Sequence, residues 1–290
     1  MGTSELRLVR ERKLAELIPA QPGGAVLEAS GVAAHGRESF VVFDNIRRIA
    51  RIGADFDSSS RLHRWVGRLR PGEGYEDIAY SRERGRFYLL IEAEKHPDGT
   101  YKAVIEECDA AWRYKGRSTV NFTFQTRKRG FEGLTSVRWQ GVEYLLALCE
   151  GNQGLPGRKG RTPGGGRIVV LEKRHRVWEP AALIKLPGAL MFKDYAALAL
   201  RGERLAVLSQ KSSRLWVGTL RRADWTIAGD GHTYDLPRTT KGKRLYCTVE
   251  GLDWVSSDTF VMVSDLCKRG YPDRCGRTDQ SIHIFRLPRR

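Results

Sequence analysis

The chain has 290 residues, of which 41% are hydrophobic and 29% are charged, and its formal net charge at pH 7 is +16. A chain of this length and composition can bury a sizeable core. No stretch approaches the roughly 18 consecutive apolar residues of a membrane-spanning helix, which excludes a helical membrane protein.

The first residues do not resemble a secretion signal. Residues 1–13 include several charged side chains and contain no apolar signal core. We therefore expect a cytoplasmic protein, and a monomer. A periplasmic or secreted location is the alternative if the sequence lacks a native signal peptide.

One short acidic motif recurs five times, each time at the start of an apolar segment. Successive copies lie 48 to 62 residues apart. The motif acids are Glu28, Glu76, Glu132, Asp194 and Glu250. Strand-rich repeats of about 40 to 60 residues are typical of β-propellers, with one blade for each repeat.

Each copy continues with a second apolar strand that ends at a polar residue. This residue follows the motif acid by 15 to 18 positions in all five copies. The five polar residues are Asp44, Glu92, Glu150, Gln210 and Asp265. So constant an offset indicates a repeated hairpin unit rather than chance.

The second copy shows four strands, at residues 78–81, 87–91, 101–106 and 119–125. The last copy has no fourth strand after its third. We expect the N-terminal segment 5–17 to supply that strand and close the ring, which removes an open sheet edge.

These patterns predict one all-β domain, a five-bladed β-propeller of four-stranded antiparallel blades closed by the N-terminal strand. A six-bladed ring is the alternative. The expected blades span residues 27–70, 75–126, 131–187, 193–237 and 249–287, with the closing strand at 5–17.

The strand directions place both polar residues of every copy on one face of the propeller, near its axis. Nine of these ten residues are acidic, in a protein with a net positive charge. Crowded carboxylates raise each other's pKa and repel unless they are neutralised. A hard divalent cation, first of all Ca²⁺, prefers such oxygen ligands. We expect the metal ligands among Glu28, Asp44, Glu76, Glu92, Glu132, Glu150, Glu250 and Asp265.

A second interpretation of the five motif acids is structural. A carboxylate at the start of a strand can accept hydrogen bonds from backbone N–H groups of the neighbouring blade and so join two blades. The five polar residues that end the second strands vary more in residue type than the motif acids do. This variation fits a binding site better than a structural role.

Two long loops on the same face carry basic residues. Residues 151–166 include Arg158, and residues 266–280 include Arg269. Basic side chains above an acidic mouth that holds a cation would suit an anionic small molecule, most of all a phosphoester. The alternative is that both loops are simply solvated.

Other signals exclude several classes of protein. The sequence has no phosphate-binding P-loop, no Gly-x-Ser-x-Gly elbow and no His-Glu-x-x-His motif. Five cysteines without Cys-x-x-Cys spacing indicate buried thiols, with a Cys267–Cys275 loop as the alternative. The basic cluster 127–129 could contact nucleic acid, but basic residues are spread over the whole chain rather than gathered in one stripe. Nucleic acid is therefore a weaker partner prediction than an anionic small molecule.

The repeats resemble those of the SdiA-regulated and phytase-like propellers, including the group called esterase-like activity of phytase. The resemblance spans about residues 27–287 and is carried by the stretches 131–135, 249–254 and 75–79, which read FEGLT, VEGLDW and YEDIA. It implies calcium in the channel and, for the phytases, hydrolysis of phosphomonoesters. By position, the resemblance implies that the cation ligands are Glu76, Glu132, Glu250 and the acids that end the second strands.

The fourth copy departs from this family pattern. It has Lys193 beside Asp194, and Gln210 followed by Lys211, where further acids are expected. The chain also lacks the dense aspartate clusters of propeller phytases.

The sequence therefore predicts a propeller that binds a divalent cation and an anionic small molecule, with hydrolysis as an open question. The candidate catalytic residues are Glu132, Arg158, Lys211 and Arg269. One alternative is a non-catalytic scaffold that binds a protein or polyanion, with a structural ion or none. Another is a lactonase-like hydrolase with Asn45 and Asn152 on the axis.

Overall fold

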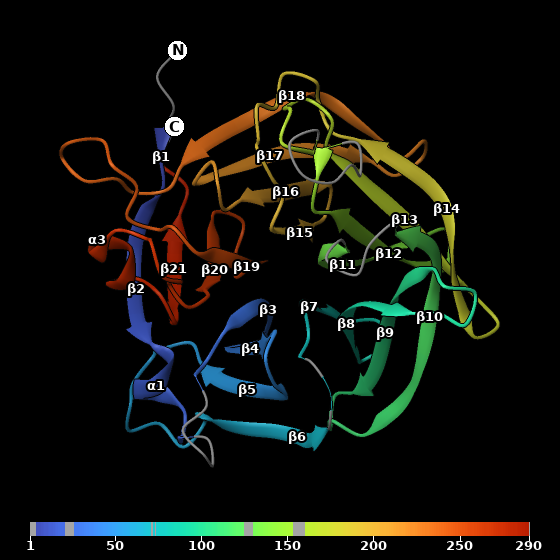
Figure 1. Ribbon diagram of the computed structural model, residues 1–290, viewed down its shortest axis with the longest axis horizontal. Coiled ribbons are helices and arrows are strands. Elements are labelled where there is room, and N and C mark those ends of the chain that lie inside the picture. The colour runs from blue at the N-terminus through green and yellow to red at the C-terminus, as the bar shows by residue number, and fades with distance from the viewer. Residues whose placement is uncertain are drawn as a thin grey trace.

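The structure is a computed structural model that describes residues 4–20, 26–70, 72, 74–124, 130–152 and 160–289. The fold is all-β, with antiparallel strands arranged in sheets around a central axis (Figure 1). In this part of the chain no helix is long and apolar enough to cross a membrane.

The strands follow one another as successive four-stranded antiparallel units. The first unit contains β3 (Ala29–His35), β4 (Glu38–Phe43), β5 (Arg47–Gly53) and β6 (Arg64–Arg70). The second contains β7 (Asp77–Ser81), β8 (Arg86–Lys95), β9 (Tyr101–Asp109) and β10 (Tyr114–Phe124). The third contains β11 (Phe131–Trp139), β12 (Val142–Cys149), β13 (Arg167–Arg174) and β14 (Val177–Lys185).

Two further units follow along the chain. One contains β15 (Ala197–Arg201), β16 (Arg204–Ser209), β17 (Arg214–Arg221) and β18 (Thr226–Asp235). The other contains β19 (Val249–Trp254), β20 (Thr259–Ser264) and β21 (Ser281–Arg286). The helices are single turns, α1 (Leu14–Leu17) and α3 (Asp273–Gly276).

The second and third units are joined at their outer edges. Thr119 and Val120 of β10 pair in parallel with Val177 and Trp178 of β14, so the two units form one eight-stranded sheet. The described strands therefore make four sheets rather than one sheet for each repeat. The sequence did not indicate this link, because nothing in either strand marks an edge that pairs with a neighbour.

The N-terminal segment joins the last unit to the one before it. Strand β1 (Ser4–Glu5) pairs in parallel with β18, and β2 (Arg7–Lys13) pairs antiparallel with β21. The pairing of β2 is the one that the sequence predicts for this segment. Between the two strands, Leu6 is buried in the apolar core that the fourth and last units share.

Apolar side chains fill the space between adjacent units. All six residues of β20 are buried, because neighbouring units cover both faces of this strand. The first strand of each unit lies innermost (Figure 1). These strands, β3, β7, β11, β15 and β19, contact one another in turn, and β19 contacts β3. The start of each inner strand therefore lies close to the axis.

We predict that Leu6→Ala destabilises the fold by about 2–4 kcal/mol, because it leaves a cavity where the N-terminal segment packs on the shared core. Leu8→Ala is the matched control, since Leu6 is 2% exposed and Leu8 is 38% exposed. Urea unfolding should show a cost below about 1 kcal/mol for the control. Equal costs for the two variants would contradict this role of Leu6.

Candidate functional site

The strand register defines which residues occupy equivalent positions in the units. In β11 and β19 the motif glutamates Glu132 and Glu250 lie at an irregularity between two paired residues. Ser30 occupies this position in β3. In the second and fourth units the equivalent residues are Glu76 and Ala196, whose N–H groups donate to the carbonyls of Leu90 and Leu208.

The predicted alignment is therefore wrong by two residues in the first and fourth copies. Glu28 and Asp194 each lie two positions before the equivalent of the motif glutamate, which is Ser30 in one copy and Ala196 in the other. Three glutamates rather than five acids share the motif position. Glu28 and Asp194 still reach the same end of the channel, but from a different point on the chain.

The glycine of the Glu-Gly motif allows the inner strands to approach closely. A Cβ atom on Gly133 would lie 2.9 Å from the backbone nitrogen of Leu198 in β15. A Cβ atom on Gly251 would lie 2.9 Å from the backbone of Gly31 in β3. Only a residue without a side chain fits at such contacts, and this close approach brings the neighbouring carboxylates together.

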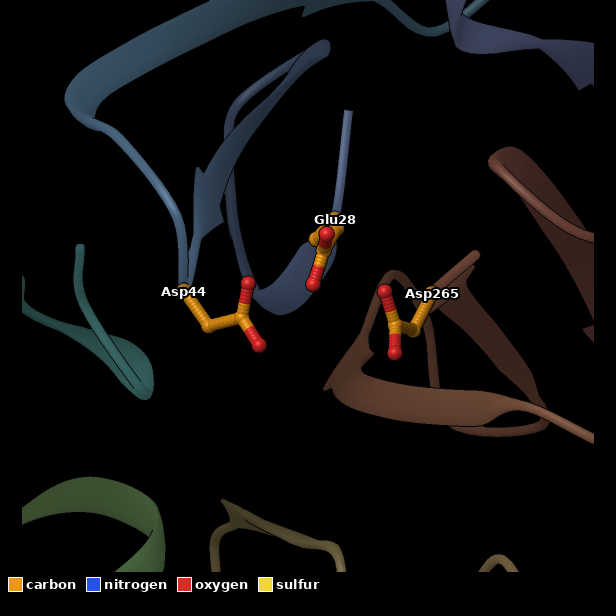
Figure 2. A group of neighbouring side chains, drawn as sticks. All are labelled: Glu28, Asp44 and Asp265. Carbon is orange, nitrogen blue, oxygen red and sulfur yellow. The ribbon is translucent and has the colours of Figure 1, made fainter. Parts of the chain in front are cut away.

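Three carboxylates converge at the junction of the first and last units. Glu28 precedes β3, Asp44 follows β4, and Asp265 follows β20. Each offers one oxygen atom, and these three atoms lie within 4.8 Å of one another. Figure 2 shows the three side chains around a common gap.

Asp44 is the least satisfied member of this group. Its Oδ1 atom is buried and has no hydrogen-bond partner among the described residues. Burial, followed by the charges of Asp265 and Glu28, raises the pKa of Asp44 to about 7. Burial also raises the pKa of Asp265 to about 6, although Lys268, whose Nζ lies 3.6 Å from Asp265 Oδ2, opposes the shift.

The three motif glutamates continue the acidic group along the channel mouth. Burial raises the pKa of each well above its ordinary value, and neighbouring carboxylates add to the effect. For Glu76 the largest contribution from a neighbour comes from Glu92, for Glu132 from Glu76, and for Glu250 from Asp265. Glu150 also raises the pKa of Glu132.

These mutual effects show that the acids of several units lie close enough to interact. Among the acids named as metal ligands, Glu28, Asp44 and Asp265 lie close enough to share one ion. Which of them bind an ion stays a prediction.

The fourth unit differs from the others. Asp194 is buried and accepts hydrogen bonds from Ser209 Oγ and from the backbone N–H of Lys211. The Gln210 side chain donates to Glu250 Oε1 at 2.5 Å. Polar contacts within the protein thus already engage the carboxylate of Asp194, which gives it a structural role.

Two aspartates that the sequence did not single out join neighbouring units. Asp77 is buried and accepts the N–H of Leu134 in β11 at 2.6 Å. Asp253 accepts the N–H of Ala34 in β3 at 2.7 Å. The structural interpretation offered for the motif acids therefore applies to these two residues, which lie one and three positions beyond a motif glutamate. Their role is visible only once the neighbouring backbone is placed.

Basic side chains border the acidic mouth. Lys211 Nζ lies 3.6 Å from Asp194 Oδ2, and Arg269 lines the same surface cavity as Lys211. The predicted catalytic candidate Arg158 and the cluster 127–129 lie outside the described residues. Of the four catalytic candidates, Glu132 lies in the acidic group, and Lys211 and Arg269 lie at its border.

The asparagine pair of the lactonase-like alternative does not form a site. The side-chain amide of Asn152 donates to the carbonyls of Gly160 and Phe192, and its oxygen accepts from Gly165 N–H and Tyr195 Oη. A buried amide with this many partners has a structural role. Asn45 donates instead to the carbonyl of Val26 on the surface.

The cysteine prediction is also wrong in its pairing. Cys247 forms a disulfide with Cys275, and their Cα atoms are 5.5 Å apart. Cys108 and Cys149 are buried thiols, as expected, and Cys267 is unpaired. The partner of Cys275 could not be read from the sequence, because Cys247 is brought to it by the fold over 28 residues.

Comparison with known proteins identifies the fold alone. No protein-family profile matches the chain, and no curated protein matches it by sequence. Many solved structures are similar to it, and three of them serve as examples.

The PQQ-bound aldose sugar dehydrogenase of Streptomyces coelicolor matches with a TM-score of 0.52 and 13% identity, covering 97% of this chain and 98% of that one. The glutaminyl cyclase of Myxococcus xanthus matches with a TM-score of 0.55 and 11% identity, covering 97% and 95%. A family 43 β-xylosidase/α-arabinofuranosidase from a compost metagenome, in a calcium-free form, matches with a TM-score of 0.52 and 10% identity, covering 98% and 96%.

These neighbours identify the chain as a β-propeller-like, all-β protein. They include enzymes with different activities. Function must therefore be argued from the site.

We predict that Asp44 makes the metal-free protein less stable as the pH rises. Its pKa of about 7 in the folded state exceeds the ordinary value of 3.8. Between these two pH values the folded state therefore binds more protons than the unfolded state does. Relative to Asp44→Asn, the wild type should lose about 1–2 kcal/mol of unfolding free energy between pH 4 and pH 8, after allowance for solvent screening. Urea unfolding in chelator at both pH values measures this loss. A constant difference between the two proteins would contradict the prediction.

Proposed function

We propose that the acidic channel mouth binds a divalent cation, Ca²⁺ by preference, and presents it to an anionic small molecule such as a phosphoester. The observation that carries this proposal is the convergence of Glu28, Asp44 and Asp265, with one buried Asp44 oxygen left without a hydrogen-bond partner. A buried oxygen without a partner costs free energy, and a bound cation would remove that cost.

The dimensions of the group fit calcium. Oxygen ligands lie 2.3–2.6 Å from Ca²⁺, so two oxygens bound to the same ion can be at most about 5 Å apart. The three carboxylate oxygens lie within 4.8 Å of one another. Calcium also tolerates irregular geometry and completes its coordination with water. The donor set consists only of oxygen atoms, which disfavours zinc and copper.

We further propose that the scaffold is a five-bladed propeller of the SdiA-regulated, phytase-like type. The order of the strands supports five successive four-stranded units, the last completed by β2, because the eight-stranded sheet is two such units joined by β10 and β14. The family assignment rests on the Glu-Gly-Leu stretches at Glu132 and Glu250.

The border of the site supports an anionic ligand. Lys268 lies beside Asp265, and Lys211 and Arg269 line a cavity on the same side. A divalent cation bound at the mouth would polarise a phosphoryl oxygen. Lys211 and Arg269 would then attract the remaining negative charge of the ligand, and Glu132, whose pKa is raised, would hold a proton near it.

The second candidate function is a non-catalytic scaffold that binds a protein or polyanion, with a structural ion or none. It is favoured by Asp77 and Asp253, which show that carboxylates near the axis do join neighbouring units in this protein. The two functions differ in whether the ion keeps coordination positions open for a ligand.

We predict that Ca²⁺ raises the thermal midpoint of chelator-treated protein by several degrees, because binding to the folded state at 100 times Kd adds about 2.7 kcal/mol. Asp44→Asn should abolish most of this rise. Asp230→Asn, which alters an exposed carboxylate in β18, is the matched control and should behave as the wild type. Thermal unfolding and calorimetric titration with CaCl₂ measure both effects. An equal rise in Asp44→Asn, or none in the wild type, would reject the cation site.

Hydrolysis is tested separately with a panel of phosphomonoesters and lactones. If the site is catalytic, we expect phosphomonoester turnover that requires Ca²⁺ and falls about 100-fold or more in Glu132→Gln, while Ca²⁺ binding persists. Lys211→Met should lower turnover with less effect on the metal. Calcium binding without turnover of any compound would instead support the scaffold function.

A further inference from the structure

A basic groove lies beside the acidic mouth and is separate from the proposed cation ligands. It consists of two adjoining cavities of about 520 and 700 Å³, which share the side chains of Lys193, Lys211 and Arg244. Seven of the ten described residues that line the first cavity are lysine or arginine, and five of the nine that line the second. Neither set of lining residues includes a carboxylate.

Some of these cations have a carboxylate partner, since Arg214 and Arg238 pair with Asp235 and Lys211 pairs with Asp194, but others keep their charge unneutralised. Among the described residues, the ammonium groups of Lys193 and Lys243 have no hydrogen-bond or ion-pair partner. Arg244 donates to the carbonyl of Lys211 at 2.7 Å, and Arg274 donates to the carbonyl of Arg244 at 2.9 Å. A carbonyl oxygen positions a guanidinium group without cancelling its charge. The cations without a carboxylate partner repel one another unless an anion lies among them.

The groove is also held in a fixed shape. The disulfide between Cys247 and Cys275 covalently joins the segment that carries Lys243 and Arg244 to the segment that carries Arg274. Thr278 Oγ1 donates to the carbonyl of Leu245 at 3.0 Å and adds a second link between the same segments. The backbone segments that carry Lys243, Arg244 and Arg274 are thus positioned before any ligand arrives, which lowers the entropic cost of binding.

Each cavity also exposes one large apolar side chain. Met191 is 60% exposed in the first cavity, and Tyr271 is 40% exposed in the second. A small polyphosphate has no apolar or aromatic group that could contact these side chains. In a duplex the faces of the bases are stacked on one another and cannot contact them either. A single strand offers both a chain of phosphates and bases that stack on exposed side chains. We propose that this groove binds the phosphodiester backbone of single-stranded nucleic acid, with a base stacked on Tyr271.

Fluorescence anisotropy with labelled 20-nucleotide oligo(dT) and oligo(U), in non-reducing buffer at several salt concentrations, tests the proposal. We expect the double variant Lys193→Ala/Lys243→Ala to bind about tenfold more weakly at 150 mM salt. The slope of log K against log salt should fall by about 1.4, since each phosphate contact contributes about 0.7 for single strands. Lys95→Ala/Lys185→Ala removes the same charge from exposed positions in β8 and β14 and should bind within twofold of the wild type.

Two further variants test the stacking of a base on Tyr271. Tyr271→Ala should bind about tenfold more weakly, and Tyr271→Phe should bind as the wild type does. The oligo(dT) and oligo(U) arms show whether DNA or RNA is preferred. Asp44→Asn and chelator should leave oligonucleotide binding unchanged, so failure of the cation site and failure of the groove can be told apart.

Three results would overturn the proposal. Equal weakening in both lysine double variants would mean that only the overall charge matters. Equal affinity for a duplex of the same length would remove the role of exposed bases. Full displacement by inorganic tripolyphosphate, with normal binding by Tyr271→Ala, would show a site for small phosphates instead.

Discussion

The crowding of the innermost strands around one axis is the constraint from which most of this structure follows. Neighbouring inner strands come so close that Gly133 and Gly251 leave no room for a Cβ atom. Side chains near the start of these strands, or just after their hairpin partners, can therefore lie close together, as Glu28, Asp44 and Asp265 do. When most of those side chains are carboxylates, their charges interact strongly, and the pKa values of Glu76, Glu132 and Glu250 rise.

Carboxylates near the axis of the protein differ in whether they accept hydrogen bonds from the backbone. Asp77 and Asp253 accept backbone N–H groups from a neighbouring inner strand, so their charge contributes to cohesion between units. Asp44 has no such donor for its buried oxygen. Asp44 lies beside Glu28 and Asp265 at the junction of the first and last units, where we propose that a cation binds.

Much of the architecture could be predicted from the sequence, because each copy repeats an acid, an apolar strand and a polar residue at nearly constant spacing. The register could not be predicted where that pattern changes. Ser30 and Ala196 occupy the position of the motif glutamate in the first and fourth copies. Glu28 and Asp194 lie two residues earlier, and because they are acidic the sequence pattern aligns them with the motif in their place.

Features that join distant segments also could not be predicted from the sequence. The Cys247–Cys275 disulfide and the parallel pairing of β10 with β14 each depend on where the fold brings the chain. The basic groove has the same origin. Its lysines and arginines come from separate loops, and along the chain they look like a general basic bias rather than a cluster.

The pairing of β2 with β21 has a consequence for how this protein is made. Strand β2 finds its partner only after residues 281–286 have been made, whereas β1 pairs with the earlier strand β18. During synthesis the other units can assemble in order, while β2 stays unpaired until β21 is available. Pairing of β2 with β21 then closes a loop that contains all the units between them, which is entropically slow. Until that step, the outer edge of β21 remains open to other chains.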